Sequence, residues 1–439
     1  MRGRHAVATR AFNGGIHPAD RKDATSALAV TRARVPQVLR VPLSQHLGAP
    51  CAPTVGKGDR VLRGQVIGDV EAMVSAPVHS PVTGEVVEIG PVLVASGARV
   101  QAVSIAPDEV QEFDRFEPVE RGATVPETVR AAGIVGMGGA AFPTAVKLQP
   151  PKGMEVRTLI LNGCECEPYL TCDHRTMLEY PERVVRGAEL IASAVGATRT
   201  VIAVEDNKRD AAAALEERAD ASVEVMVVPT RYPQGAEKQL IWAVIGSEVP
   251  HGKLPAATGA LVHNVSTAAA VADAVDRGRP LMERVVTVTG NVRNPGNYLA
   301  LLGTPVADLI EAAGGLHGEY GRIIAGGPMT GMALADLSVP VVKGMGGIVV
   351  LDPGDTAPAV HGDQPCIRCS RCSDACPMML EPFAIGIYAN RADWDGTQRF
   401  HALDCIECGC CSYVCPTRRP LVQLIRRAKQ VLLEKGASL

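Results

Sequence analysis

Residues 366–377 read CIRCSRCSDACP, and residues 405–416 read CIECGCCSYVCP. Both stretches follow one pattern, C-x2-C-x2-C-x3-C, and both end in proline. Bacterial proteins that hold two [4Fe–4S] clusters use this spacing, and in them the fourth cysteine of each run binds the other cluster. The repeated pattern therefore predicts a helical ferredoxin-type domain with two [4Fe–4S] clusters.

The same rule divides the eight cysteines into two sets of ligands. Three closely spaced cysteines wrap one face of a cluster, so the fourth corner must come from elsewhere. We therefore assign the first cluster to Cys366, Cys369, Cys372 and Cys415, and the second to Cys376, Cys405, Cys408 and Cys411. Cys410 also lies in the second run, but alignment with the first run selects Cys411. The alternative, a pair of zinc ribbons, is disfavoured because both runs hold four cysteines and end in Cys-Pro.

The composition excludes several classes of protein. With 439 residues, of which 46% are hydrophobic and 21% charged, the chain is long enough for several folded domains. Only 3% of residues are aromatic and the net charge is −3, which argues against nucleic acid as a partner. The start has no apolar signal region, so the 13 cysteines are expected to be metal ligands or redox thiols rather than disulfides. No apolar run reaches the length of a membrane span.

Four regions differ in sequence texture and are predicted to be separate domains. Short runs rich in valine, glycine and proline fill residues 1–112 and are typical of strands joined by tight turns. Residues 113–270 alternate strand-like with alanine-rich helical runs, which predicts a mostly parallel sheet. Residues 271–355 return to β texture around one helix, and residues 356–439 hold the cysteine runs. We therefore expect a multidomain protein of α/β and β type.

The chain closes with a basic, amphipathic stretch, LVQLIRRAKQVLLEKG, which contains Arg426, Arg427, Lys429 and Lys435. One role for such a helix is contact with anionic lipid. The other is packing of its apolar stripe against the ferredoxin-type domain. The modest length and charge favour packing.

A glycine-rich loop in the second region is a candidate nucleotide site. Residues 133–144 read GIVGMGGAAFPT, and Gly136, Gly138 and Ala141 fit the dinucleotide pattern G-x-G-x-x-G/A. The match is weak because the residues before the loop look helical rather than strand-like. An ordinary glycine-rich turn explains the loop equally well.

A strand that follows the loop strengthens the case for a ligand site. RTLILNG (157–163) runs into NGCECEPY (162–169), and ligands of open α/β sheets bind beyond the carboxyl ends of strands. Asn162 is placed to bond a flavin ring edge, Glu165 and Glu167 to hold ribose or nicotinamide groups, and Lys147 to meet a phosphate. The same stretch contains Cys164, Cys166 and Cys172. They are either ligands of a further cluster or small buried residues. A third cluster is not expected here, because it would need a fourth ligand and Cys51 is the only other spare cysteine outside the two cysteine runs.

GMGGAAFPTAVKL (136–148) followed by NGCECEPYLTCDHR (162–175) is similar to the flavin- and NADH-binding region of the flavoprotein subunit of respiratory complex I. The full order of motifs resembles the RnfC subunit family of the Rnf ion-translocating electron-transport complexes over essentially the whole chain. The motifs that carry this resemblance are NGGIHP (13–18), VPLSQHLGAP (41–50), RYPQGAEKQL (231–240), VPHGKL (249–254) and the paired cysteine runs.

The resemblance implies a binding site for FMN and NAD(H), with no catalytic side chain because the cofactor performs the hydride chemistry. This likeness implies roles for eleven residues. The FMN phosphate and the nucleotide entrance are lined by Gly136, Gly138, Gly139, Phe142 and Lys147. FMN is contacted by Asn162 and Glu165, the nicotinamide lies near Glu167 and Glu237, and the flavin pocket is completed by Asn264 and Thr267. Three residues depart from the pattern: Ala141 replaces a usual glycine, Cys164 an acid, and His263 an asparagine.

The two β regions also resemble known modules. Residues 1–112 are similar to a barrel-sandwich hybrid, the fold of lipoyl and biotinyl carriers. The hairpin DVEAMVSAP (69–77) has no lysine to acylate, so we expect a docking surface rather than a carrier. Residues 271–355 are similar to the SLBB-type β-grasp module found after this flavoprotein fold.

The resemblance implies a peripheral subunit on the cytoplasmic face of the bacterial inner membrane. There it would pass electrons between NAD(H), FMN and two [4Fe–4S] clusters. The complex as a whole would couple electron transfer between NAD(H) and ferredoxin to ion translocation, and it would contain other membrane and iron–sulfur subunits. One alternative is a soluble NADH-dependent flavin and iron–sulfur reductase of the cobalamin-reductase type. The other is a non-enzymatic iron–sulfur conduit whose flavin pocket is vestigial.

Overall fold

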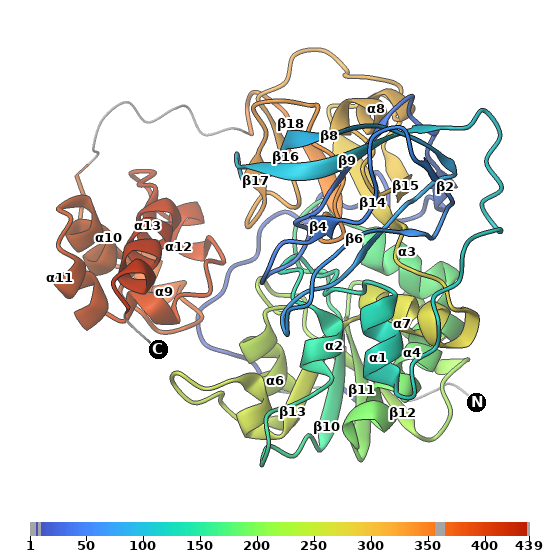
Figure 1. Ribbon diagram of the computed structural model, residues 1–439. Helices are drawn as coiled ribbons and strands as arrows, with labels where there is room; N and C mark the ends of the chain where they lie inside the picture. Colours follow the sequence, from blue (N-terminus) through green and yellow to red (C-terminus); the bar gives the residue numbers. More distant parts are fainter. Residues whose placement is uncertain (1–5, 8–9, 356–364, 437–439) are drawn as a thin grey trace.

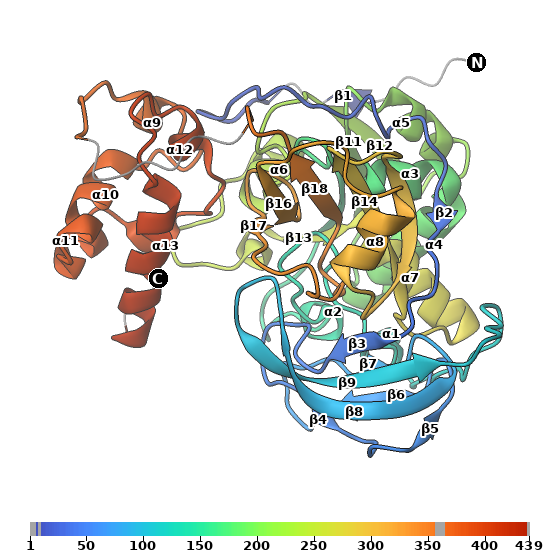
Figure 2. The same cartoon turned by 90° about the horizontal axis from the view of Figure 1, so that it is seen from above.

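The structure is a computed structural model that describes residues 6–7, 10–355 and 365–436. Its helices and strands form a body of three packed domains with a fourth, all-helical domain beside them (Figure 1). Seen from above, the barrel strands lie along one edge of the body, next to the β-grasp and flavoprotein-like domains, and the helical domain projects to one side (Figure 2). The mixed α/β and β architecture expected from the sequence is confirmed.

A five-stranded parallel sheet forms the flavoprotein-like domain, in the order β1-β12-β11-β10-β13. Its strands are apolar runs of a few residues, as expected for strands that are buried on both faces. The strands are β1 (Ala6–Val7), β10 (Thr158–Gly163), β11 (Arg199–Glu205), β12 (Val223–Val228) and β13 (Ala260–Asn264). Alternate residues of β10 point to opposite faces: Leu159 and Leu161 belong to one core, and Ile160 belongs to another.

Helices cover both faces of this sheet. One face carries α4 (Pro181–Val195), α5 (Arg209–Glu216) and α7 (Val265–Arg277), and the other carries α6 (Glu237–Ile245). The remaining helices of the domain are α1 (Val125–Ala131), α2 (Thr144–Lys147), α3 (Cys172–Glu179) and the 3-10 turn η1 (Pro255–Thr258). The glycine loop connects α1 to α2, and Thr144 and Lys147 of α2 line the cavity beyond the ends of β10 and β13.

The β-grasp domain is a six-stranded mixed sheet in the order β17-β16-β18-β14-β15-β2. Its own elements are β14 (Glu283–Gly290), β15 (Gly296–Leu301), α8 (Val306–Ala312), β16 (Arg322–Ala325), β17 (Met332–Ala333) and β18 (Gly347–Leu351). The edge strand β2 (Thr31–Arg32) comes from near the N-terminus and pairs in parallel with β15.

The barrel-sandwich domain consists of two small sheets. One has the order β3-β9-β8-β5 and the other β4-β6-β7. The strands are β3 (Leu39–Pro42), β4 (Ala52–Pro53), β5 (Arg60–Val61), β6 (Val66–Asp69), β7 (Val78–His79), β8 (Gly84–Leu93) and β9 (Arg99–Pro107). Cys51 is buried in the apolar core between these sheets, with Leu39, Val41 and Ile67 among its neighbours.

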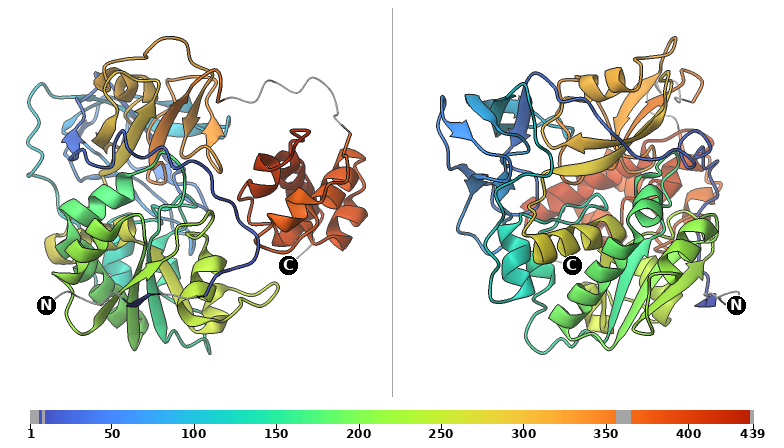
Figure 3. Two further views of the ribbon diagram at one scale, coloured as in Figure 1. Left: turned by 180° about the vertical axis from the view of Figure 1, so that it is seen from behind. Right: turned by 90° about the vertical axis from the view of Figure 1, so that its right-hand side faces the viewer.

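Residues 10–34, which we call the N-terminal strap, connect the other domains rather than belonging to the barrel (Figure 3). Ile16 forms an antiparallel bridge with Tyr232 of the flavoprotein-like domain, and Gly15 donates its N–H to the carbonyl of Ala375 in the helical domain at 3.0 Å. The strap then adds β2 to the β-grasp sheet. The predicted first domain, residues 1–112, therefore contains a segment that pairs with three other parts of the chain.

The helical domain contains α9 (Arg371–Asp374), α10 (Pro382–Asn390), α11 (Trp394–Arg399), the 3-10 turn η2 (Ala402–Asp404), α12 (Cys410–Tyr413) and α13 (Leu421–Glu434). The two cysteine runs have matching backbones, because left-handed residues recur at equivalent places. The equivalent pairs are Arg368 with Glu407, Ser370 with Gly409, and Met379 with Arg418. The duplicated sequence thus folds as a duplicated loop-and-helix unit. The stretch rich in proline, aspartate and glycine at residues 353–365 is predicted from its composition to be a linker, and residues 356–364 of it lie outside the described residues.

The C-terminal helix α13 packs on its own domain, as favoured from its sequence. Leu421, Ile425 and Leu432 are buried in the core of the helical domain. Arg426 and Lys429 both pair with Glu407, at 2.9 and 2.7 Å. Within the described part of the chain, no helix combines the length and the apolar character that crossing a bilayer requires.

Candidate functional site

A cavity of about 520 Å³ lies beyond the carboxyl ends of β10 and β13, where the sequence predicted a ligand site. It is walled by the glycine loop, the β10 loop and the start of α6, and on one side by the helical domain. Eight of the eleven predicted flavin and nucleotide residues line it: Gly136, Gly138, Phe142, Lys147, Asn162, Glu167, Glu237 and Asn264.

The other three predicted residues lie outside the cavity wall and support it. The carboxylate of Glu165 accepts the backbone N–H groups of Asp173 and His174, at 2.7 and 3.1 Å, at the start of α3. The hydroxyl of Thr267 accepts the N–H of Met137 at 2.9 Å and so fixes the glycine loop against α7. Gly139 belongs to that loop and has a φ of 114°.

The glycine loop leaves room for a ligand because two of its wall positions have no side chain. A Cβ built on Gly138 would lie 3.4 Å from the Cβ of Asn264, which is another residue of the cavity wall. Ala141, which stands where the resemblance implies a glycine, has a φ of 51°. This left-handed conformation favours glycine, which gives that expectation a backbone reason.

Charged and polar groups converge on the cavity. The ammonium of Lys147 lies 2.7 Å from a carboxylate oxygen of Glu237. The Nε2 atom of His263 is buried and has no hydrogen-bond partner among the described residues. Burial and the charge of Lys147 lower the pKa of His263, so the imidazole is neutral at physiological pH. An unpaired buried nitrogen beside a cationic group suits a ligand with a hydrogen-bonding ring and a phosphate.

His263 was treated from the sequence only as a departure from the family pattern, yet it lines the cavity. Cys164, another departure, is fully buried with its thiol toward the carbonyl of Ala203, at 3.9 Å, so it lies away from the cavity. Cys166 does line the cavity and accepts the N–H of Gly235 at 3.3 Å. Cys172 is buried, as expected for a small core residue.

The loop that carries Cys166 and Glu167 is held from behind by two buried lysines. Lys22 of the N-terminal strap donates to the carbonyls of Glu165 and Glu167, at 3.0 and 2.8 Å, and to that of Leu170. Lys208 donates to the carbonyl of Cys164 at 2.7 Å. Neither lysine belongs to a recognisable motif, so reasoning from the sequence missed both.

Glu167 joins the site to the β-grasp domain. Its carboxylate accepts the N–H groups of Met329 and Thr330, at 3.0 and 2.8 Å, and also the hydroxyl of Thr330. A side chain at Gly327 would collide with this carboxylate, because a Cβ there would lie 2.3 Å from Oε2. Glu167 therefore anchors the turn between β16 and β17 against the cavity.

Asp173 holds Asn264, a cavity residue, in place. Its two carboxylate oxygens accept Asn264 Nδ2 at 2.6 Å and Ser266 Oγ at 2.5 Å. Burial and the nearby charge of Glu165 raise the pKa of Asp173 to about 6, although the two hydrogen bonds act in the opposite direction. The carboxyl group thus changes its charge just below neutral pH.

We expect the free energy of unfolding of an Asp173→Asn variant to depend less on pH than that of the parent. Because the folded pKa of Asp173 lies above the ordinary value of 3.8, its contribution to stability is complete below about pH 4 and is lost as the pH rises through about 6. Between pH 5 and 7.5 the variant should gain roughly 1–2 kcal/mol relative to the parent. Urea unfolding at both pH values measures this gain, and parallel pH profiles would contradict it.

Two smaller cavities in the helical domain hold the cysteines of the two runs. One is lined by Cys366, Cys369, Cys372 and Cys415, and the other by Cys376, Cys405, Cys408 and Cys411 together with Cys410. The eight cysteines are thus grouped in the two sets that the spacing predicted, and ligation itself stays a prediction. Backbone N–H groups point at several of the sulfurs, as at Cys366 and Cys405.

Among the described residues, no three His, Cys, Asp or Glu side chains converge on one point that could hold a metal ion. The choice of [4Fe–4S] clusters over zinc rests on the spacing of the two cysteine runs.

The second cysteine set lies next to the flavin-type cavity. Cys408 and Ile406 line both cavities. The hydroxyl of Tyr232, another wall residue of the large cavity, donates to the carbonyl of Cys408 at 2.7 Å. The first set lies toward the surface, where Cys369 is exposed and Ile367 is 61% exposed.

The sequence matches four known domain families in order along the chain. They are the RnfC barrel-sandwich hybrid domain (residues 10–110), the Nuo51 FMN-binding domain (129–273), the SLBB domain (285–333) and the 4Fe-4S dicluster domain (359–416).

Curated relatives match nearly the whole chain. A subunit of the Na(+)-translocating ferredoxin:NAD(+) oxidoreductase complex of Acetobacterium woodii is 43% identical over 96% of this chain and 97% of its own length. A subunit of the proton-translocating ferredoxin:NAD(+) oxidoreductase complex of Clostridium ljungdahlii is 42% identical over 96% and 93%. A subunit of the ion-translocating oxidoreductase complex of Rhodobacter capsulatus is 42% identical over 98% and 85%.

Solved structures share the fold. A chain of an NAD+-reducing [NiFe]-hydrogenase in the H2-reduced state superposes with a TM-score of 0.51 and 22% identity. The alignment covers 70% of this chain and 62% of that one. At this level of identity the likeness concerns the fold alone.

Proposed function

This chain belongs to the RnfC family, whose members are subunits of the ion-translocating ferredoxin:NAD+ oxidoreductase complexes, and we propose from this membership and from the cavity beyond β10 how its residues serve that activity. It is part of an oxidoreductase complex that couples electron transfer between NAD(H) and ferredoxin to ion translocation. The observation that carries the residue-level proposal is the pairing of sites: a flavin-sized cavity and a cysteine-lined cavity share Cys408 and Ile406.

The residues around the large cavity fit FMN and a nicotinamide nucleotide. Bound FMN would supply the conversion between two-electron hydride chemistry and one-electron transfer. Gly136 and Gly138 give the backbone room to approach a phosphate, Lys147 offers it a positive charge, and His263 offers a neutral nitrogen. Asn162 donates to the carbonyl of Gly235 at 2.8 Å and keeps the opposite wall in place. No side chain of this chain needs to act as acid or base.

The two cysteine sets would hold the two [4Fe–4S] clusters, which supply one-electron transfer. Cys408 of the second set forms part of the wall of the large cavity, whereas Cys369 of the first set is exposed. We propose that the surface around Cys369 and Ile367 faces an electron-transfer partner within the complex. We further propose that the chain is a peripheral subunit on the cytoplasmic face of the membrane, with membrane contact mainly through other subunits.

Neither alternative function is favoured. The three relatives reported above match nearly the whole chain and are complex subunits, which does not support a free-standing reductase of the cobalamin-reductase type. The cavity is open and the Nε2 atom of His263 has no hydrogen-bond partner in the described part of the chain, which does not support a vestigial flavin pocket. The departure at Cys164 has no bearing on the cavity, because that side chain is in the core.

Anaerobic reconstitution with iron, sulfide and FMN tests this function. We expect one bound flavin, about eight iron atoms per chain, and NADH-driven reduction of an artificial acceptor. Eight irons without flavin binding and without NADH activity would instead favour the iron–sulfur conduit.

We expect a Tyr232→Phe variant to pass electrons from NADH to an acceptor more slowly while retaining its flavin and iron. The change removes one hydrogen bond to Cys408 between the two sites, and a single bond is worth about 1 kcal/mol, so the rate should fall by about two- to tenfold. Tyr388→Phe is the matched control, because the Tyr388 ring stacks on Phe400 elsewhere in the helical domain. Equal rates in both variants would contradict a role for the Tyr232 hydroxyl.

A further inference from the structure

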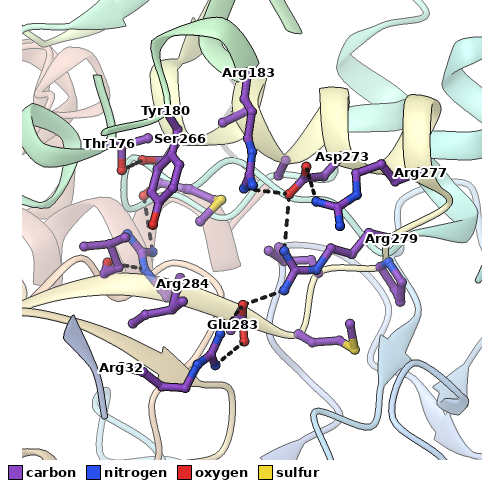
Figure 4. Close-up of a pocket in the computed structure, with 18 of the residues that line it drawn as sticks. Arg32, Thr176, Tyr180, Arg183, Ser266, Asp273, Arg277, Arg279, Glu283 and Arg284 are labelled. Carbon is purple, nitrogen blue, oxygen red and sulfur yellow. Dashed lines mark hydrogen bonds and ion pairs between the residues drawn. The ribbon is translucent and has the colours of Figure 1, made fainter. Parts of the chain in front are cut away.

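A second cavity, of about 250 Å³, lies between the flavoprotein-like and β-grasp domains (Figure 4). It is bounded by α4 and α7 on one side and by the start of β14 on the other. Its wall contains five arginines but only three acids. The arginines are Arg32, Arg183, Arg277, Arg279 and Arg284, and the acids are Asp114, Asp273 and Glu283. We call this cavity the arginine pocket.

The carboxylate of Asp273 is shared by three arginines of the pocket and makes a short ion pair with none of them. Figure 4 shows Asp273 between the guanidinium groups of Arg183, Arg279 and Arg277. The shortest N···O distances are 3.3, 3.5 and 3.8 Å in that order. A well-formed bond between a guanidinium and a carboxylate measures about 2.7–2.9 Å. These arginines therefore keep donors that a second anion could engage.

The other central carboxylate is also shared. Glu283 lies 2.9 Å from Arg32, 2.9 Å from Arg63 and 2.5 Å from Arg279. Burial opposes its ionisation, but the hydrogen bond from Arg32 and the charges of Arg63 and Arg279 lower the pKa of Glu283 to about 2. Glu283 is thus already ionised at physiological pH and cannot supply further negative charge.

Apolar side chains also line the pocket, among them Leu281, Val285 and Leu299. Like charges near a surface of low dielectric repel one another, and a bound anion would relieve this repulsion. The pocket also backs onto the flavin-type cavity. Met137 lines the pocket, and its neighbours Gly136 and Gly138 line the cavity.

We propose that the arginine pocket binds a small polyanion, a phosphorylated or multiply carboxylated molecule, between the arginines that share Asp273. The size of the pocket suits a compact ligand rather than a macromolecule. The site is distinct from the cavity for FMN and NAD(H), so this proposal stands or falls independently of the proposed function.

Isothermal titration calorimetry of the full chain tests the proposal, with pyrophosphate and citrate as separate probes at matched ionic strength. Excess FMN is present throughout, so that the flavin cavity cannot account for the heat. We expect saturable binding of at least one probe with a stoichiometry of one, and the tighter probe identifies the class of ligand. The absence of saturable binding by either probe would overturn the proposal.

Variants locate the site. Arg183→Gln combined with Arg277→Gln should weaken binding about tenfold or more, because the two changes remove charged donors that would engage the anion. Both side chains are partly exposed, at 34% and 46%, so the fold should tolerate the changes. The control is Arg186→Gln, on the same helix as Arg183, whose side chain pairs with Asp276 and Glu189 outside the pocket.

A second variant does not depend on removing arginines. Ala270→Glu places a carboxylate on a lining position of α7, where it would take the place of the ligand. We expect this variant to bind neither probe and to melt at a higher temperature than the ligand-free parent. Binding that survives unchanged in both the arginine variant and Ala270→Glu would overturn the assignment to this pocket.

Discussion

A Cys411→Ala variant is expected to lose one of the two clusters and about half of its iron, from about eight to about four atoms per chain. Cys411 is buried in the cavity that it shares with Cys376, Cys405 and Cys408. A cluster that has lost one of four thiolates has no replacement ligand of the right spacing in the first run. Because this cavity adjoins the flavin-type cavity, NADH-driven reduction of an acceptor should fall to background while flavin remains bound.

Cys410→Ala is the matched control, because it removes a thiol from the adjacent position of the same helix. The internal repeat aligns Cys410, the first residue of α12, with Arg371, the first residue of α9, and it aligns Cys411 with Cys372. An arginine is no cluster ligand, so Cys410 should be dispensable: iron content, visible absorption and acceptor reduction should match the parent. Loss of iron from Cys410→Ala but not from Cys411→Ala would overturn the ligand assignment.

The sequence was most informative where chemistry depends on spacing. The cysteine runs predicted both the helical domain and the division of its thiols into two cavities, because cluster geometry restricts how far apart ligands can lie. The glycine loop and the β10 loop predicted the cavity for a similar reason, since parallel strands present their carboxyl ends at one edge.

Side-chain direction within the β10 loop could not be predicted. Glu165 and Glu167 stand two residues apart, yet one binds the start of α3 and the other binds the β-grasp turn. Glu165 has a φ of 44° and Tyr169 a φ of 71°, so the loop reverses where no glycine signals it. Such left-handed residues are rare outside glycine and follow from tertiary contacts rather than from local sequence.

The contacts of the N-terminal strap and of the two lysines behind the β10 loop could not be predicted from the sequence either. Strand β2 has two residues, too few for any alternation to be visible. Lys22 reaches the β10 loop across more than a hundred residues of chain, and a lone lysine normally indicates an exposed position. Only the folded structure brings these groups together.

Lys208→Met is expected to lower the free energy of unfolding by about 3–5 kcal/mol, the usual cost of leaving one member of a buried ion pair without its partner. Lys208 and Glu205 are both almost fully buried, with Nζ 2.9 Å from Oε2. The other oxygen of Glu205 has no hydrogen-bond partner among the described residues. Burial already raises the pKa of Glu205, and the charge of Lys208 opposes that rise. Urea unfolding at pH 7 measures the loss.

The double variant Glu205→Gln with Lys208→Met separates the two roles of this lysine. Removing both charges leaves no unpaired ion, so most of the lost stability should return, to within about 1–2 kcal/mol of the parent. The bond from Lys208 to the carbonyl of Cys164 is absent in both variants, so the loop that carries Cys166 and Glu167 stays released. Flavin affinity, measured by fluorescence titration, should therefore be weakened in the single and the double variant alike. Recovery of flavin affinity together with stability would contradict a positioning role for Lys208.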